Sequence, residues 1–305
     1  ANIAIAFSLL FLIMGNGLIT LIVFNVILAF GFNIKDMCES SILYDSISDS
    51  TEKLDTFSKK DGRGTSYHFY LDAICSCLAG LLFVFNPYLP IILCIIFTCV
   101  SIFLSFKFEE INNIKTTKEL LNFKNTAHLG SYITELKDIF AFILKSNRLK
   151  SLLFFSSIFA AFLSIMTTLR TSLLAEIDVP EAYFGIVMAG IQFISGIVSK
   201  KHLFVNKIFK NKTLSVLALG NTIFLIVVGL IVYCDFPSSF IAFTLILWLT
   251  FYATARGIYY PIIKRYLNSF SIPKVNTKIY ASQTVFDSLT KIPFSLLASY
   301  ILSIT

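Results

Sequence analysis

The 305-residue sequence predicts an all-α integral membrane protein, and its composition supports that fold class. Hydrophobic residues make up 56% of the chain, charged residues only 14%, and the mean hydropathy is +0.79. A soluble domain carries about a quarter charged residues, because its surface faces water. This chain has too few charges to cover such a surface. Its long apolar runs instead fit lipid, in which helices satisfy their own backbone hydrogen bonds.

Nine apolar segments are candidates for membrane-crossing helices, which need about 20 largely apolar residues each. The first is too short to cross alone, so we expect it to be a truncated helix. Tight turns are expected at 15–17 and 86–87, and Pro261 and Pro293 are expected to kink the last two spans. The predicted spans are 2–14, 18–47, 67–85, 88–106, 151–175, 183–199, 213–234, 240–263 and 279–304.

Lys and Arg residues outside these spans occupy one alternate set of loops. The loops at 48–66, 107–150, 200–212 and 264–278 hold all of them. The opposite loops, at 15–17, 86–87, 176–182 and 235–239, hold none. By the positive-inside rule the basic loops are cytoplasmic, and the chain is a multi-pass protein of the cell membrane. This asymmetry explains the net charge of +7 without a nucleic-acid partner.

The segment 107–150 separates four predicted spans from five. Within it, apolar residues recur at helical spacing among charged ones, as in an amphipathic helix on the inner membrane surface. A linker helix packed on the bundle is the other interpretation. The apolar residues are Tyr132, Leu136, Ile139, Phe140 and Ile143.

Two stretches of sequence resemble the major facilitator superfamily, whose members have two six-helix halves. Residues 39–46, read as Glu-Ser-Ser-Ile-Leu-Tyr-Asp-Ser, precede a charged loop and Asp61-Gly62-Arg63-Gly64. They resemble the end of the family's fourth helix and its loop to the fifth. Residues 256–261, read as Arg-Gly-Ile-Tyr-Tyr-Pro, precede a basic loop and 278–282. They resemble the tenth helix entering the eleventh.

The resemblance implies that the nine spans are the family's third to eleventh helices. Residues 1–106 are then the remainder of an N-terminal bundle, 107–150 the cytoplasmic linker, and 151–305 a C-terminal bundle that lacks its last helix. The chain departs from the family's drug–proton antiporters at 71–85, which keeps only Gly80 of their Gly/Pro-rich fifth-helix signature. Proton exchange therefore does not follow from the resemblance.

Several ionisable residues lie within the predicted spans. Such a side chain costs about 2.5–3.5 kcal/mol at mid-bilayer and usually faces a partner or a water-filled cavity. Lys35 and Glu39 are one helical turn apart, as are Asp287 and Lys291, so each couple can form an ion pair within its own helix. The full set is Lys35, Asp36, Glu39, Asp72, Arg170, Arg256, Asp287 and Lys291.

The resemblance divides this set, because the family's first, fourth, seventh and tenth helices line its central cavity. The substrate-binding or ion-coupling candidates are Lys35, Asp36, Glu39, Arg170 and Arg256. Arg170 also lies near the acidic residues Glu176 and Asp178, which favours an outer-gate role equally. The flanking helices carry gate or structural candidates, namely Asp72, Asp287 and Lys291. Purely structural pairing is the alternative for every member.

The resemblance and the topology together predict a secondary active transporter that moves a small solute by alternating access. Ion-coupled efflux of a drug-like compound is the first interpretation, nutrient uptake the alternative, and a channel or membrane scaffold the remaining ones. The expected partners are the solute, protons or another coupling ion, and the lipid bilayer. No cofactor, metal or enzymatic activity is expected, because phosphate-loop, HExxH and GxSxG motifs are absent and His68, His128 and His202 are scattered.

Overall fold

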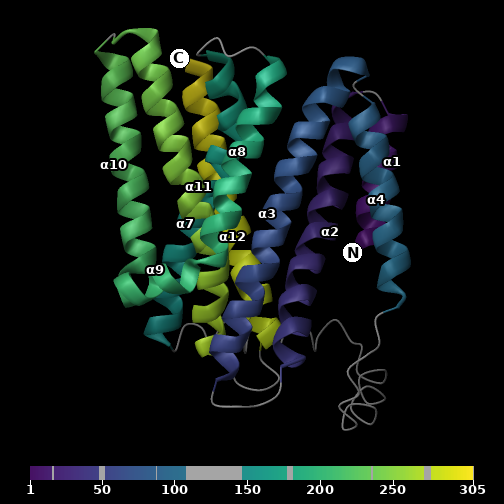
Figure 1. The fold of residues 1–305 in the computed structure, drawn as a ribbon. Coiled ribbons are helices and arrows are strands. Elements are labelled where there is room, and N and C mark those ends of the chain that lie inside the picture. Colours follow the sequence, from purple (N-terminus) through teal and green to yellow (C-terminus); the bar gives the residue numbers. More distant parts are fainter. Residues whose placement is uncertain are drawn as a thin grey trace.

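The computed structural model describes residues 1–15, 17–47, 52–86, 88–107, 146–176, 181–234, 236–270 and 276–304. The regular structure in these ranges is entirely helical, without a strand among the described residues (Figure 1). In chain order the elements are α1 Asn2–Met14, α2 Leu18–Asp45, α3 Lys53–Phe85, α4 Leu89–Ser105, α7 Asn147–Glu176, α8 Glu181–Lys200, α9 His202–Phe209, η1 Lys210–Lys212, α10 Thr213–Tyr233, α11 Ser238–Ser269 and α12 Asn276–Ile304.

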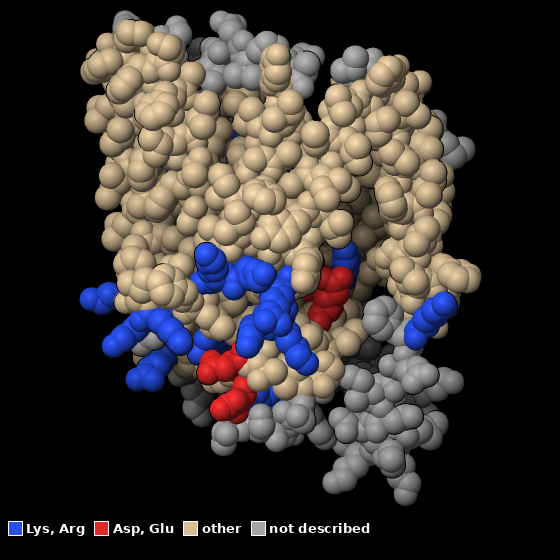
Figure 2. Space-filling model, in the orientation of Figure 1, with Lys and Arg blue, Asp and Glu red and all other residues tan. Residues whose placement is uncertain are grey.

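Six of these helices are long and apolar enough to cross a membrane, which is compatible with the expected helical membrane protein. They are α2, α3, α7, α8, α10 and α11, whereas α1 and α4 are apolar but shorter. In the space-filling view, charged residues gather toward one end and the rest of the visible surface is almost entirely uncharged (Figure 2). We call the charged end the basic end. An apolar perimeter of this kind fits a lipid surround.

Two segments that we expected to be basic loops are helical instead. Helix α3 begins at Lys53, so Asp61-Gly62-Arg63-Gly64 lies inside it rather than before it. Residues 200–212 contain α9 and η1. Two glycines among charges disfavour a helix in isolation, but packing against other helices overrides local propensity. Here the Ser199 hydroxyl donates a hydrogen bond to the Gly62 carbonyl, 3.2 Å away.

Helix α3 packs chiefly against α8 and α11, although it precedes the 107–150 linker. Figure 1 shows it between a group formed by α1, α2 and α4 and a group formed by α7, α8 and α10–α12. Glycine allows this close approach to α8, because a Cβ on Gly185 would lie 2.8 Å from the Ser76 carbonyl oxygen and 3.3 Å from the Gly80 Cα. Small residues at such positions bring helix backbones together in membranes.

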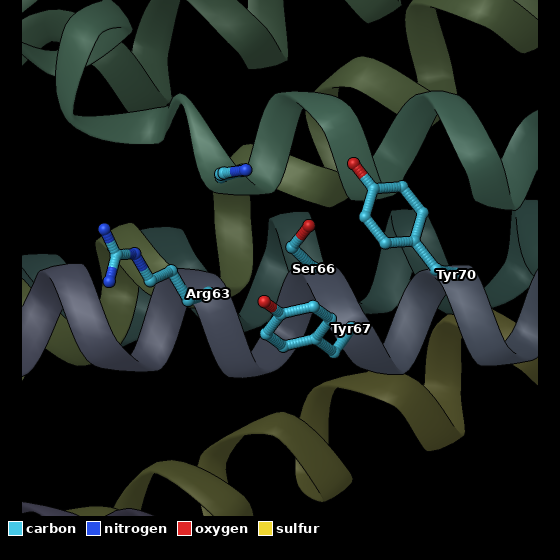
Figure 3. A pocket seen from close by; sticks show the side chains of 5 residues that line it. Arg63, Ser66, Tyr67 and Tyr70 are labelled. Carbon is cyan, nitrogen blue, oxygen red and sulfur yellow. The ribbon is translucent and has the colours of Figure 1, made fainter.

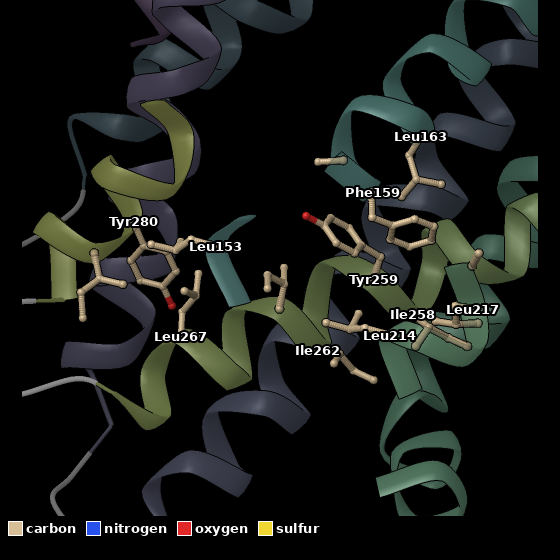
Figure 4. Packing of buried hydrophobic residues seen from close by; sticks show 14 of the residues in the cluster. Leu153, Phe159, Leu163, Leu214, Leu217, Ile258, Tyr259, Ile262, Leu267 and Tyr280 are labelled. Carbon is tan, nitrogen blue, oxygen red and sulfur yellow. The ribbon is translucent and has the colours of Figure 1, made fainter. Parts of the chain in front are cut away.

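The largest buried cluster joins α7, α10, α11 and α12. Figure 4 shows Phe159 and Leu163 beside Tyr259, whose hydroxyl donates to the Ser156 carbonyl at 3.0 Å. Helix α11 lies at its centre, because its residues Tyr252, Ile258 and Ile262 are all essentially inaccessible. The prolines at 261 and 293 lie inside continuous helices. The predicted amphipathic helix around 132–143 falls outside the described residues.

Replacing Gly185 by Leu should destabilise the protein by about 1–3 kcal/mol, because the added side chain would overpack the α3–α8 contact. The measurement is thermal unfolding of the purified chain in detergent. Gly190→Leu on the same helix is the matched control, since a Cβ at Gly190 would meet nothing within 4 Å. Equal melting temperatures for the two variants would contradict the tight α3–α8 contact.

Candidate functional site

Three polar residues from different helices meet inside the bundle. Gln192 on α8 donates through its amide nitrogen to Asp72 Oδ2 on α3 at 3.4 Å, and its amide oxygen accepts from Arg256 Nη1 on α11 at 2.8 Å. A carboxamide suits this position, because it has both a donor and an acceptor. Gln192 is only 4% exposed. The three residues form a chain of hydrogen bonds between oppositely charged groups.

Two further contacts hold this chain in place. The Arg256 guanidinium lies over the ring of buried Phe69, 5.1 Å from its centroid, which is a favourable cation–π distance. On α11, a Cβ at Gly257 would clash with the Ser195 carbonyl of α8, so glycine lets α11 approach next to Arg256. Ser195 also donates its hydroxyl to the Ala253 carbonyl at 2.9 Å. Helices α8 and α11 are thereby held together around the Gln192–Arg256 hydrogen bond.

Arg170 on α7 adds a second guanidinium to this region. It interacts electrostatically with Arg256, Asp72 and the Tyr252 hydroxyl. Its Nε and Nη1 atoms are buried without a hydrogen-bond partner among the described residues, and so is Arg256 Nε. Two guanidinium groups and one carboxylate therefore interact electrostatically, and the guanidinium groups have unused donors. An arrangement with surplus positive charge and free N–H groups attracts an anion.

The depth of this group follows from helix geometry. Asp72 lies 11 residues beyond Asp61 on α3, a rise of about 16 Å, and Arg256 lies eight residues before Lys264 on α11, about 12 Å. Asp61 and Lys264 form an ion pair of 3.2 Å at the basic end. The hydrocarbon core of a bilayer is about 30 Å thick, so helices that enter it near the Asp61–Lys264 pair would carry this group to about half of that depth. Ionisable residues at that depth are usually functional.

The other charges predicted for the transport site do not join this group. On α2, Lys35 and Glu39 form the expected ion pair within one helix, 3.7 Å apart, and Asp36 is exposed. No described hydrogen bond or ion pair connects them to Arg256. Of the expected binding residues, the structure therefore brings together Arg170 and Arg256 only. The side chains of Glu176 and Asp178, expected near Arg170, lie outside the described residues.

The residues predicted to form a gate or structural bridges have different neighbours. Asp72 contacts Gln192 and lies 3.9 Å from the exposed His68 ring on its own helix. Asp287 on α12 lies instead near Lys291 and the buried Tyr259 of α11, close enough for electrostatic interaction. No hydrogen bond or ion pair among the described residues joins Asp287 to Asp72. Asp72 thus contacts α8, whereas Asp287 lies near Lys291 and α11.

Sequence reasoning missed Gln192, which connects the two charges. The sequence carries a signal for it, because Gln192 interrupts the apolar run of the span at 183–199. An amide inside a membrane helix needs a hydrogen-bond partner, as a charge does. Gln192 carries no charge, so a search for ionisable residues does not find it.

At the basic end, α3 and α11 are joined by two ion pairs and one buried histidine lies beside them. Asp61 binds Lys264 at 3.2 Å and Asp55 binds Arg265 at 2.6 Å. His202 of α9 is 1% exposed, with Nε2 2.9 Å from the Ser58 hydroxyl and Nδ1 2.7 Å from the Ser199 carbonyl. A carbonyl only accepts, so Nδ1 carries the proton, and in the neutral ring Ser58 donates to Nε2.

The sequence matches no protein-family model, and neither a curated protein nor a solved structure matches it. The resemblance to the major facilitator superfamily therefore stays a prediction.

Replacing Gln192 by Met should lower stability by about 1–3 kcal/mol, because it leaves the Asp72 and Arg256 groups without their shared partner. Thermal unfolding in detergent measures the effect. Thr250→Val is the control, since among the described residues the Thr250 hydroxyl donates only to the Ile246 carbonyl of its own helix. If Gln192→Met were as stable as the control, the hydrogen-bonded chain would not hold the helices.

Stability should fall as the pH is lowered. Burial, assisted by nearby Arg265, lowers the pKa of His202 below its ordinary 6.5, against the opposing effects of the Ser199 carbonyl and Asp61. The unfolded chain thus takes up the proton first. Stability is complete above the unfolded-state pKa and is lost as the pH falls from there through the folded-state pKa.

Melting temperatures between pH 8 and pH 5 measure this loss. His202→Asn should flatten the pH dependence, because the amide does not titrate yet still donates to the Ser199 carbonyl. His68→Asn should keep most of the slope, since the His68 side chain is 67% exposed. An unchanged slope in His202→Asn would assign the pH dependence to other groups.

Proposed function

We propose that the chain is a secondary active transporter that moves a small organic anion across the cell membrane by alternating access. The observation that carries this proposal is the interhelical group of Arg170, Arg256 and Asp72, with guanidinium N–H atoms that lack partners among the described residues. Buried polar groups are normally satisfied, so unsatisfied donors favour a ligand that accepts from them. Carboxylates and phosphates fit guanidinium groups best.

The position of the group between the two halves of the chain supports alternating access. Asp72 belongs to the part before the linker, and Gln192 and Arg256 belong to the part after it. The hydrogen bond within the second part is short, at 2.8 Å, whereas the one across the boundary is 3.4 Å long. Rocking of one half against the other breaks the longer contact first. A bound anion then replaces the Asp72 carboxylate as the counter-charge of the arginines.

The two-bundle arrangement and the orientation belong to the same proposal. Contacts within α1, α2 and α4 and within α7, α8 and α10–α12 are compatible with two bundles like those of the major facilitator superfamily. The basic end faces the cytoplasm by the positive-inside rule. The surplus of positive charge favours an organic anion over the cationic compounds common among exported drugs. The geometry favours neither efflux nor uptake.

The test measures counterflow in proteoliposomes that contain the chain, with a panel of radiolabelled carboxylates, phosphate esters and organic cations. We expect saturable, trans-stimulated flux of at least one anion. Arg256→Ala should reduce that flux by about 100-fold, because a buried charged hydrogen bond is worth roughly 1.5–3 kcal/mol and the site also loses its counter-charge. Arg256→Lys should retain an intermediate rate.

The matched control is Asp36→Asn, an exposed charge on α2, which should transport at the wild-type rate. Membrane insertion of each variant is checked by its yield in the membrane fraction. Full transport by Arg256→Ala would remove the arginine from the mechanism. Currents at channel rates would contradict the carrier and indicate a pore. Flux of cations alone would contradict an anionic substrate.

A further inference from the structure

A pocket lies outside the group of Asp72, Arg170, Gln192 and Arg256, between α3 and α8 at the basic end. It has a volume of about 260 Å³ and is lined by Arg63, Ser66, Tyr67, Tyr70 and Lys200. The four α3 residues fall at spacings of three and four, so they share one face of the helix. Figure 3 shows Ser66 and Tyr70 with their hydroxyls pointing toward α8, and Arg63 along the same side of α3.

The lining has the chemistry of an anion site. It combines two cations with three hydroxyl groups and includes no carboxylate. Ser66 is 2% exposed, and its Oγ has no hydrogen-bond partner among the described residues. Tyr70 is held by its ring contact with Phe193, at 5.4 Å between centroids. A phosphate group uses such a set well, because each oxygen accepts strong bonds from cations and hydroxyls.

The place of the pocket indicates where the phosphate comes from. One helical turn farther from the basic end, the same sides of α3 and α8 carry exposed apolar side chains. Leu71 is 62% exposed, Ile74 57% and Phe193 53%. The pocket therefore lies where a charged surface meets an apolar one. A lipid headgroup at this level places its acyl chains beside those apolar residues.

We propose that this pocket binds the phosphate of an acidic membrane lipid, such as a phosphatidylglycerol. The adjacent pocket, of about 690 Å³, is a poorer anion site, because its lysines and arginine share it with Glu52 and Asp55. The lipid site is independent of the transport proposal, since it shares no residue with the buried group. It fits the general preference of basic pockets between helices for anionic headgroups.

The experiment is native mass spectrometry of the purified chain in detergent, titrated with phosphatidylglycerol or with phosphatidylcholine of the same acyl chains. We expect one phosphatidylglycerol to bind far more tightly than phosphatidylcholine. The double variant Arg63→Gln/Lys200→Gln should weaken that binding by about 30-fold, because each basic group near an anionic headgroup contributes about a factor of five. Ser66→Ala should weaken it by about 10-fold through the lost hydroxyl.

Lys59→Gln/Lys207→Gln is the matched control, because it removes the same net charge from the adjacent pocket. It should bind phosphatidylglycerol like the wild type. Equal weakening in both double variants would overturn the site in favour of general surface attraction, and unchanged binding in Arg63→Gln/Lys200→Gln would also overturn it. Competition by inorganic phosphate at the same concentration as the lipid would overturn the lipid assignment and leave a site for a soluble phosphate.

Discussion

The close antiparallel contact of α3 with α8 is the constraint on which the site depends. Small residues occupy both of its ends, with Gly62 beside Ser199 at one end and Gly80 beside Gly185 at the other. Asp72 and Gln192 lie between these ends. A shift of one helical turn, about 5.4 Å, would remove Asp72 from reach of the amide. The backbone contact therefore sets the register that makes the polar contact possible.

Much of the fold follows from the sequence, because the solvent imposes a simple pattern on it. Apolar length alone located the helices at 18–47 and 213–234 to within two residues, whereas the helix predicted at 240–263 continues to Ser269. Apolar length failed at 53–66 and 200–212, where short-range signals of charge and glycine indicate loops but contacts with other helices stabilise helical structure. Such contacts join residues that are distant in sequence, so a single sequence does not reveal them.

Part of the site was predictable because charged residues are rare within apolar segments. Arg170, Asp72 and Arg256 stand out as charges within apolar segments, and the structure brings these three together. Lys35 and Glu39 look similar in the sequence but neutralise one another on α2. Which charges meet depends on the rotation and register of whole helices, and those are decided by residues such as Gly185 and Gly257. The neutral Gln192 carries no charge that would single it out.

The contacts at the basic end bear on how the proposed transporter moves. Asp61 is 7% exposed in its ion pair with Lys264, and this pair joins the two parts of the chain just as the Asp72–Gln192 contact does. In the proposed mechanism this ion pair and that of Asp55 with Arg265 connect α3 to α11 at the basic end, so opening that end separates both pairs. The Asp72–Gln192 contact has to separate in the same motion. A ligand drives that opening only by binding the open form more tightly. An anion that binds Arg170 and Arg256 after Asp72 has moved away would bind the open form more tightly. The negative charge of the solute would then favour opening.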